Sequence, residues 1–379
     1  MLRRLPHFSS GLCFLSSVSV GAPAPPLPPP LRPPLRLLGA GTSLAHPEKE
    51  RGEDAFFSLP RALGVADGVG GWAEHGVDAG EYARQLMSHV ERSACAARPG
   101  GGPPPPPLEL LEAAHAAVRV EGSSTACVAT LGGALSPSGA GGCPLLVHNV
   151  GDSGLQVWGV AAAGGAGGAP APLRLEEAAR LWRCAHVARM TQHGFNFPRQ
   201  LAADERYSDA PGPHGAGAAF PLAGGELLLA ATDGLWDNLD EGALRAVLSR
   251  FDFSTCRAYA RMQRARFAAA AAAARDAAGS PIGEGGSGVP LETRFPVAGE
   301  DVSDAALLGK EREALAQLRA MSAALAFAAQ RVGADPRAST PFAEGAARAG
   351  QRFKGGKLDD ATVVVALVTA DPAFFTAHV

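Results

Sequence analysis

The chain has 379 residues, and 46% of them are hydrophobic, which is enough for a folded core and argues against a disordered protein. The formal net charge of −3 gives no overall positive field, so we expect no nucleic-acid partner. Six cysteines without a C-x-x-C pair favour free thiols over a zinc ribbon or a disulfide framework. No apolar run approaches the roughly 18 residues that a membrane helix requires, so we expect no membrane span.

The N-terminal segment has the composition of an organelle transit peptide. Its first 47 residues contain no Asp or Glu, while Arg3, Arg4, Arg32 and Arg36 punctuate Ser, Leu and small residues. A proline tract at 23–34 favours extended polyproline geometry that cannot pack a core. We therefore expect residues 1–47 to be a transit peptide and linker that direct the protein to the mitochondrial matrix, with a plastid as the alternative. A Pro-rich tail without a targeting role is the simpler explanation.

A folded domain is expected over residues 48–379. A strand that ends at Asp67 precedes a helix over about 77–92, and a second helix is predicted at 108–120. The turn at 151–154 predicts that the strands on either side of it form an antiparallel hairpin. The further expected strands are 123–131, 145–150, 155–160, 226–232 and 361–369.

Residues 252–356 differ in character, because they are Ala-rich and dotted with arginines. A Gly/Pro break at 279–290 separates two helical stretches, and Ser303 supplies an N-cap for the second, which ends near Val332. We expect a helical insertion in the domain that is available as a surface for a protein partner. Its arginines at 257–266 are expected to form a solvated helix face rather than an RNA-binding site.

Acidic motifs at predicted strand ends carry most of the functional information. Each adjoins an apolar β-type run or a glycine turn, which places the carboxylates at one rim of a sheet. Carboxylate oxygens without His or Cys suit hard cations such as Mg²⁺ and Mn²⁺ rather than zinc. The motifs are Gly52-Glu53-Asp54-Ala55, Val65-Ala66-Asp67-Gly68-Val69-Gly70-Gly71-Trp72, Ala231-Thr232-Asp233-Gly234 and Lys357-Leu358-Asp359-Asp360-Ala361-Thr362.

In their order and wording these motifs, with Asn149–Gly154 and Thr191–Asn196, resemble those of the metal-dependent serine/threonine protein phosphatases of type 2C, and within them the organellar subgroup. The resemblance covers about 50–370 apart from the helical insertion. It implies an α+β fold, a four-layer α-β-β-α sandwich with two central antiparallel sheets and a dimetal cleft at one end. It also implies hydrolysis of phosphoserine and phosphothreonine in protein substrates by water that two Mn²⁺ or Mg²⁺ ions activate.

The resemblance also implies roles for individual residues. Asp67 would bridge the two ions, and Asp152 stands in the position of a third, weaker metal site. The family pattern favours Asp359 over Asp360 as the ligand, so Asp360 is expected to hydrogen-bond within the turn. With Asp67 and Asp233 as the catalytic carboxylates, the implied ligands of the two main sites are Glu53, Asp67, the carbonyl of Gly68, Asp233 and Asp359.

The chain departs from the family pattern at two functional positions, that of the general acid and that of the phosphate-binding arginine. Val69 stands where many members carry a histidine proposed as general acid, and His75 is the nearest candidate, although a lone loop histidine is more often a solvated bystander. Arg51 is the candidate for holding the phosphate, with a spacing that differs from the best-known members.

Three other interpretations compete with this one. The sequence around Ser153 imitates the nucleophile motif of chymotrypsin-like proteases, but His115 precedes it too closely, since that fold needs on the order of a hundred residues between them. A haloacid-dehalogenase-type phosphatase needs an Asp-x-Asp pair, which Asp67-Gly68-Val69 lacks. A pseudophosphatase that serves as a binding scaffold stays open as the alternative, and metal-dependent turnover separates it from the enzyme.

Overall fold

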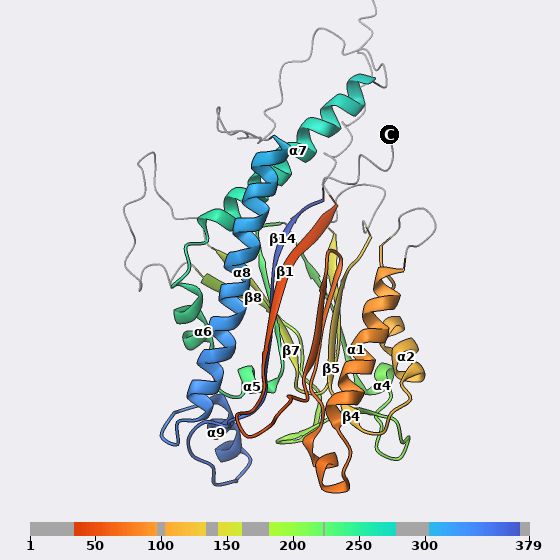
Figure 1. Cartoon of the computed structure of the whole chain (residues 1–379), viewed down its shortest axis with the longest axis vertical. Helices are drawn as coiled ribbons and strands as arrows, with labels where there is room; N and C mark the ends of the chain where they lie inside the picture. The colour runs from red at the N-terminus through yellow and green to blue at the C-terminus, as the bar shows by residue number, and fades with distance from the viewer. Residues whose placement is uncertain are drawn as a thin grey trace, which may run out of the picture.

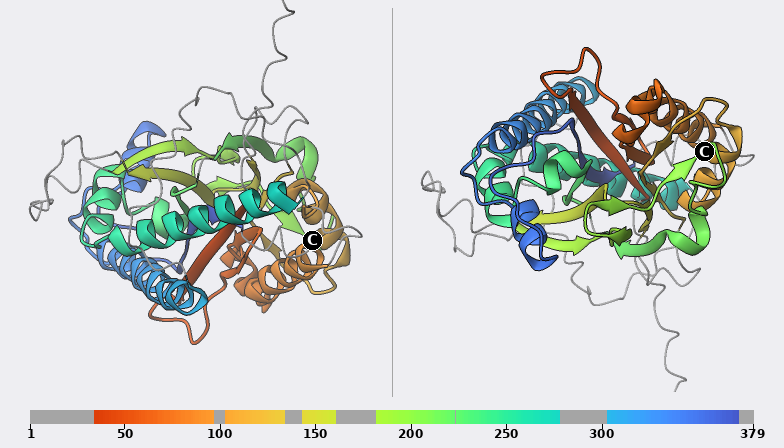
Figure 2. Two further views of the ribbon diagram at one scale, coloured as in Figure 1. Left: turned by 90° about the horizontal axis from the view of Figure 1, so that it is seen from above. Right: turned by 90° about the horizontal axis from the view of Figure 1, so that it is seen from below.

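The computed structural model describes residues 34–96, 103–133, 143–160, 182–222, 224–277 and 303–371. Within these residues, two five-stranded antiparallel sheets stack face to face, and helices cover the outer face of each (Figures 1 and 2). The predicted four-layer α-β-β-α sandwich is therefore confirmed.

The first sheet has the order β1-β14-β13-β7-β8, and the interior strand β14 is buried along its whole length. Val363 and Val365 of β14 pack toward the helices, whereas Val364 and Ala366 pack toward the second sheet. Burial on both faces explains the unbroken apolar run of this strand. The strands are β1 (Leu35–Leu44), β14 (Ala361–Ala370), β13 (Leu227–Ala231), β7 (Gly154–Val160) and β8 (Trp182–Val187).

The second sheet has the order β12-β6-β5-β3-β2, in which β2 and β3 form a hairpin. Its strands are β12 (Ala216–Pro221), β6 (Pro144–Val150), β5 (Ala126–Leu131), β3 (Ala62–Ala66) and β2 (Ala55–Leu59). Four short strands pair beside the sheets, namely β4 (Ser123–Ser124) with β11 (Leu201–Ala202), and β9 (Gln192–Gly194) with β10 (Phe197–Pro198).

The predicted hairpin around residues 151–154 is wrong. β6 pairs with β5 and β12, while β7 pairs with β13 and β8, so the turn carries the chain from one sheet to the other. Gly151 makes this crossover with a φ of 102°, and the side-chain amide of Asn149 donates to the carbonyl of Ser153 at 2.7 Å. The tight turn was correctly located, but both flanking strands are apolar on two faces and their pattern does not specify a partner.

Helices α1 (Ala79–Cys95) and α2 (Pro107–Ala117) cover the second sheet, close to the ranges expected for them. The side chain of Asp78 caps α1 by accepting from the amide of Gly80 at 2.9 Å. Tyr82, Leu86 and Val90, spaced four residues apart, are fully buried against the sheet. The periodic spacing thus gave both the helix and its buried face.

The described helices of the Ala-rich segment form the fourth layer of the sandwich, so the predicted helical insertion packs on the core with its inner side. Leu318 and Leu325 of α8 share one apolar cluster with Val365 of β14. Fully buried alanines such as Ala326 let the helix approach the sheet, so the Ala-rich composition permits close packing. The helices on this side are α5 (Asp233–Trp236), α6 (Glu241–Leu248), α7 (Ser254–Ala277), α8 (Asp304–Gly333) and α9 (Pro341–Arg348) (Figure 1).

The predicted boundary of the leader at residue 47 is also wrong. Residues 35–44 form β1, which pairs with β14 from Leu35 opposite Ala370 to Leu44 opposite Ala361. The side chain of Arg36, counted above with the leader, forms a 3.1 Å ion pair with Glu311 of α8. The absence of acidic residues here reflects an edge strand that follows a proline tract, and residues 1–33 lie outside the described part of the chain. No helix among the described residues is long and apolar enough to cross a membrane.

Candidate metal centre

The acidic motifs of both sheets meet at one end of the sandwich. Asp67 lies near the charges of Asp233, Asp54, Asp359 and Asp152, although these residues come from four different motifs. The β2–β3 hairpin supplies Asp54 and Asp67, the ends of β13 and β14 supply Asp233 and Asp359, and the β6–β7 crossover supplies Asp152. The structure therefore brings together the predicted carboxylates that lie far apart in the sequence.

The backbone around Asp67 is held on several sides. Its carbonyl accepts from the amide of Thr125 at 2.9 Å and from the hydroxyl of Ser124 at 2.8 Å. The next residue, Gly68, donates its amide to the carbonyl of Glu53 at 3.3 Å. A Cβ at Gly68 would stand 2.9 Å from that carbonyl and 2.8 Å from the backbone of Ala79, so only glycine allows this approach. The Asp-Gly pair thus holds Glu53 beside Asp67.

The backbone beside Asp233 is packed as closely as the backbone beside Asp67. A Cβ at Gly234 would lie 1.9 Å from the carbonyl oxygen of Asp360, so glycine is required where α5 meets the start of β14. The hydroxyl of Thr232 donates to Asp54 at 2.8 Å and accepts from the amide of Thr362 at 3.1 Å. Thr232 therefore connects three of the motifs in one buried position.

The carboxyl groups of the centre are crowded enough to perturb one another. Burial raises the pKa of Asp67 well above its ordinary value, and the charge of Asp233 adds to the effect. Burial likewise raises the pKa of Asp54 to about 8, with Asp360 as the next cause. The pKa values of Asp152 and Asp237 rise to about 6 and about 7, first through burial and then through Asp233. Such a cluster needs cations or protons to balance it.

The oxygen atoms of the cluster fit divalent cations. Three buried carboxylate oxygens of this cluster have no hydrogen-bond partner among the described residues, namely Oδ1 of Asp54, of Asp152 and of Asp233. An all-oxygen set of this kind suits Mg²⁺ or Mn²⁺. As the side chains stand, no three His, Cys, Asp or Glu groups of the described chain converge closely enough to hold an ion, and two ammonium groups lie among them.

These ammonium groups belong to Lys49 and Lys357. Lys49 Nζ lies 2.5 Å from Glu53 and 3.0 Å from Asp360. Lys357 Nζ lies 2.5 Å from Asp233, and it also contacts Asp237 and Asp359. Burial alone would lower the pKa of either lysine, but the neighbouring carboxylates outweigh it and hold both pKa values above the ordinary range.

The carboxylates of Asp359 and Asp360 have different partners, as the sequence suggested. The hydrogen bonds of Asp360, however, are not the ones predicted within its own turn. The carboxylate of Asp360 accepts from the amides of His46 at 2.6 Å and Glu53 at 2.7 Å, and so it fastens the β1–β2 connection rather than its own turn. Asp359 is half-buried and accepts from the amide of Asp360 at 2.9 Å. Of the pair, Asp359 has the carboxylate that is available to an ion.

Four side chains of the centre were not assigned from the sequence. Asp54 directly follows Glu53, and Asp237 follows Asp233 by one helical turn, so both could have been found from spacing. The two lysines could not, because Lys49 reaches the site across a loop and Lys357 through contacts with residues far from it in sequence.

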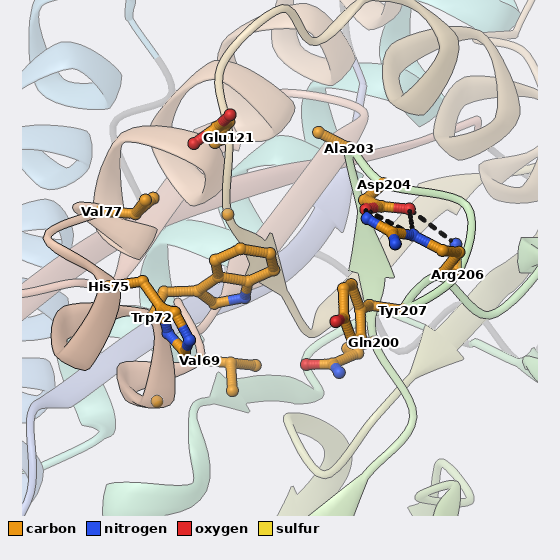
Figure 3. A pocket seen from close by; sticks show the side chains of 12 residues that line it. Val69, Trp72, His75, Val77, Glu121, Gln200, Ala203, Asp204, Arg206 and Tyr207 are labelled. Atoms are coloured by element: carbon orange, nitrogen blue, oxygen red, sulfur yellow. Dashed lines mark hydrogen bonds and ion pairs between the residues drawn. The ribbon is translucent and has the colours of Figure 1, made fainter.

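The two weaker candidates lie at the edge of the centre. Arg51 is exposed in the loop before Glu53. His75 ends the 3₁₀ helix η1 (Gly70–His75), and its ring lies 6.3 Å from that of Trp72. Figure 3 shows His75 and Trp72 on the wall of a cavity of about 520 Å³, across from Tyr207. The cavity begins at Val69, so His75 stands beside the centre rather than among its carboxylates.

The protease interpretation fails on geometry as well as on spacing. Ser153 is fully buried, and its hydroxyl bonds to that of Thr125 at 2.7 Å. His115 instead bonds to the hydroxyl of Tyr82 at 2.8 Å, on the helical layer. Ser153 is therefore a structural residue of the crossover, and among the described residues no histidine is hydrogen-bonded to its hydroxyl.

Two antiparallel sheets between helical layers, with an oxygen-rich carboxylate centre at one end, define the class of metal-dependent protein phosphatases. No protein-family model matches the chain. It is 30% identical over 378 residues to the probable protein phosphatase 2C 80 of Arabidopsis thaliana, covering 96% of this chain and 68% of that protein. It is 33% identical to the probable protein phosphatase 2C 55 of the same plant, covering 89% of this chain and 52% of that protein. The chain belongs to the protein phosphatase 2C family of metal-dependent serine/threonine phosphatases.

Other comparisons agree with this assignment. The protein phosphatase PTC7 homolog fig of Drosophila melanogaster is 34% identical over 212 residues, covering 52% of this chain and 58% of that protein. The X-ray structure of the photosystem II phosphatase PBCP has the same fold, with a TM-score of 0.56, 22% identity and coverage of 88% of this chain and all of that one. The chain thus spans about two thirds of the first Arabidopsis relative and little more than half of the second and of the fly protein.

Proposed function

We propose that this protein hydrolyses phosphoserine and phosphothreonine in phosphoprotein substrates, at the carboxylate centre built around Asp67. The observation that supports it best is the convergence of carboxylates from both sheets, with unpartnered oxygens on Asp54, Asp152 and Asp233. A pseudophosphatase is less favoured, because each carboxylate that the dimetal site needs is present in the chain and close backbone packing at Gly68 and Gly234 maintains the centre.

Two Mn²⁺ or Mg²⁺ ions, when bound, would supply an activated water and neutralise the charge of the phosphate. Asp67 would bridge them, because carboxylates from both sheets lie near it, Asp54 on one sheet and Asp233 and Asp359 on the other. Glu53 and the carbonyl of Gly68 would complete one site, and Asp233 with Asp359 the other. Thr232 and Asp360 orient this set through hydrogen bonds to Asp54 and to the backbone.

Arg51 and His75 would act at the edge of the centre. Arg51 is exposed and so can meet a substrate phosphate, and His75 lines a cavity that also includes Val69, two residues after Asp67. We propose Arg51 as a phosphate-binding residue and His75 as the proton donor to the leaving group. Loss of activity in Arg51→Ala at low substrate concentration, and a shifted pH profile in His75→Ala, would support these roles.

A targeting role is proposed for the segment that precedes β1. Because Leu35 begins a strand of the first sheet, a cleavable leader would have to end before it. Arg3 and Arg4, in a stretch without acidic residues, favour the mitochondrial matrix, with a plastid as the alternative. Fusing residues 1–34 to a fluorescent reporter tests this, since a diffuse cytosolic signal would exclude both destinations.

The helical layer restricts where a protein partner could bind. Its inner side is used against the first sheet, so a partner would meet the outer side of α8, where the side chains of Leu308 and Phe327 are 50% and 61% exposed. We keep a protein partner at this surface as a secondary proposal.

The proposed activity is tested by hydrolysis of a phosphothreonine peptide by the full chain, with Mn²⁺ and with chelator. Asp67→Asn and Asp233→Asn are expected to lower kcat by at least about 100-fold, since each removes a ligand that the reaction needs. Lys354→Met, a change at an exposed lysine, serves as the control and should keep full activity. A folded, Mn²⁺-supplied wild-type protein without turnover would favour the pseudophosphatase.

A further inference from the structure

Lys357 places an ammonium group among three carboxylates of the centre. Its ammonium nitrogen lies 2.5 Å from Oδ2 of Asp233, 2.8 Å from Oδ2 of Asp237 and 3.4 Å from Oδ2 of Asp359. The lysine side chain is only 19% exposed. Asp152 adds a further negative charge that acts on both Asp237 and Asp67. A single ammonium thus meets three carboxylates where the charge density is high.

The main chain of Lys357 is fixed, so this position is not that of a flexible surface lysine. The side-chain amide of the buried residue Asn238 accepts from the amide of Lys357 at 3.0 Å and donates to its carbonyl at 2.7 Å. The same amide donates to the carbonyl of Gly234 at 2.9 Å, which ties Lys357 to the loop of Asp233. The ring of Phe342 lies 5.2 Å from Nζ and closes the other side.

The oxygens of Asp233 are divided between two uses. Oδ2 accepts from Lys357, whereas Oδ1 is buried without a partner. Oδ1 of Asp152 is also buried without a partner, while its Oδ2 accepts from Gln192 at 2.9 Å. Asp233 can therefore give one oxygen to a divalent ion and keep the other on the ammonium, so metal binding does not require Lys357 to leave.

We propose that Lys357 is a built-in cation which permanently occupies the space between Asp233 and Asp237, and that it excludes a third divalent ion from these two carboxylates and Asp152. The centre then holds two divalent ions and one ammonium group. This inference rests on the proposed dimetal function, and it replaces the weak third metal site that the family resemblance suggests for Asp152. Lys357 acts as a positioning residue, since it touches ligands and not the reacting phosphate.

The most direct test uses the wild-type chain crystallised with Mn²⁺, with anomalous diffraction to locate the ions. The expected result is two manganese peaks and a Lys357 ammonium still within hydrogen-bond distance of Asp237. A manganese peak between Asp152 and Asp237, with the lysine displaced, would overturn the inference. Wild-type crystals without any bound manganese would instead refute the proposed metal centre itself, so the two failures are distinguishable.

A second test counts bound Mn²⁺ in variants after equilibrium dialysis. Lys357→Met keeps the length of the side chain but removes its charge, and it should bind one Mn²⁺ more than the wild type. Lys357→Arg and the control Lys354→Met should bind the wild-type number. Adding Asp237→Asn to Lys357→Met should abolish the extra ion. If folded Lys357→Met binds the same number of ions as the wild type, a purely structural role is indicated and the inference is wrong; if it does not fold, the crystallographic test still decides.

Discussion

Replacement of Thr232 by valine removes the hydroxyl that links the motifs of the centre while it keeps the β-branched shape. That hydroxyl makes two buried hydrogen bonds, to the carboxyl group of Asp54 and from the amide of Thr362. Each partner left unsatisfied costs about 1–3 kcal/mol, so the expected loss in the free energy of unfolding is about 2–6 kcal/mol. The centre should weaken in parallel, because Asp233 directly follows Thr232.

Thr130→Val is the matched control for this change. Thr130, which lies in β5, is fully buried like Thr232, but its hydroxyl has no hydrogen-bond partner among the described residues. Its replacement should be neutral or stabilise the fold by up to about 1 kcal/mol, because an unsatisfied hydroxyl is removed. Urea unfolding of both variants, in chelator and in Mn²⁺, gives the comparison. If Thr232→Val cost no more than Thr130→Val, the buried hydrogen-bond network would not hold the centre together.

The remaining predictions concern the backbone, the helical layer and pH. Gly234→Ala should cost about 1–3 kcal/mol through its clash with the backbone of β14 and should impair Mn²⁺ binding, whereas Gly71→Ala, with no atom within 4 Å of the new Cβ, should leave both measurements unchanged. Leu325→Ala should cost about 2–5 kcal/mol in urea unfolding because it opens a cavity between α8 and the first sheet, while Phe327→Ala on the exposed side should change stability little; equal effects would contradict the layer assignment. In chelator, the free energy of unfolding should fall as the pH rises from about 4 to about 8. Buried carboxyl groups such as Asp54, with a pKa of about 8, keep protons in the folded state that the unfolded chain has already lost, and Mn²⁺ should flatten this slope.

The sequence predicted the centre better than the connections between its parts. Asp67-Gly68 and Asp233-Gly234 were identifiable because the chemistry of hard cations and the packing of the backbone both restrict those positions. The periodicity of α1 similarly predicted its buried face, since Leu86 and Val90 repeat at helical spacing.

What the sequence did not predict depends on contacts between distant segments. β6 and β7 pair with strands of different sheets, and the contacts that bury both faces of each strand decide this pairing. The residues of the turn between them carry no information about it. The strand at Leu35–Leu44 was hidden by its acid-free composition, which a leader and an edge strand share. Lys357 was missed because its role depends on the clamp by Asn238, far from it in sequence.

We propose that Asp67 would bridge two divalent ions at the centre, and that these ions would carry out the hydrolysis. Electron paramagnetic resonance of the Mn²⁺-loaded chain tests it directly, because two ions that share a bridging carboxylate are magnetically coupled. The account predicts the spectrum of a coupled manganese pair in the wild type, and its loss together with phosphopeptide hydrolysis in Asp67→Asn. A wild-type spectrum of isolated ions only, with hydrolysis retained in Asp67→Asn, would contradict it.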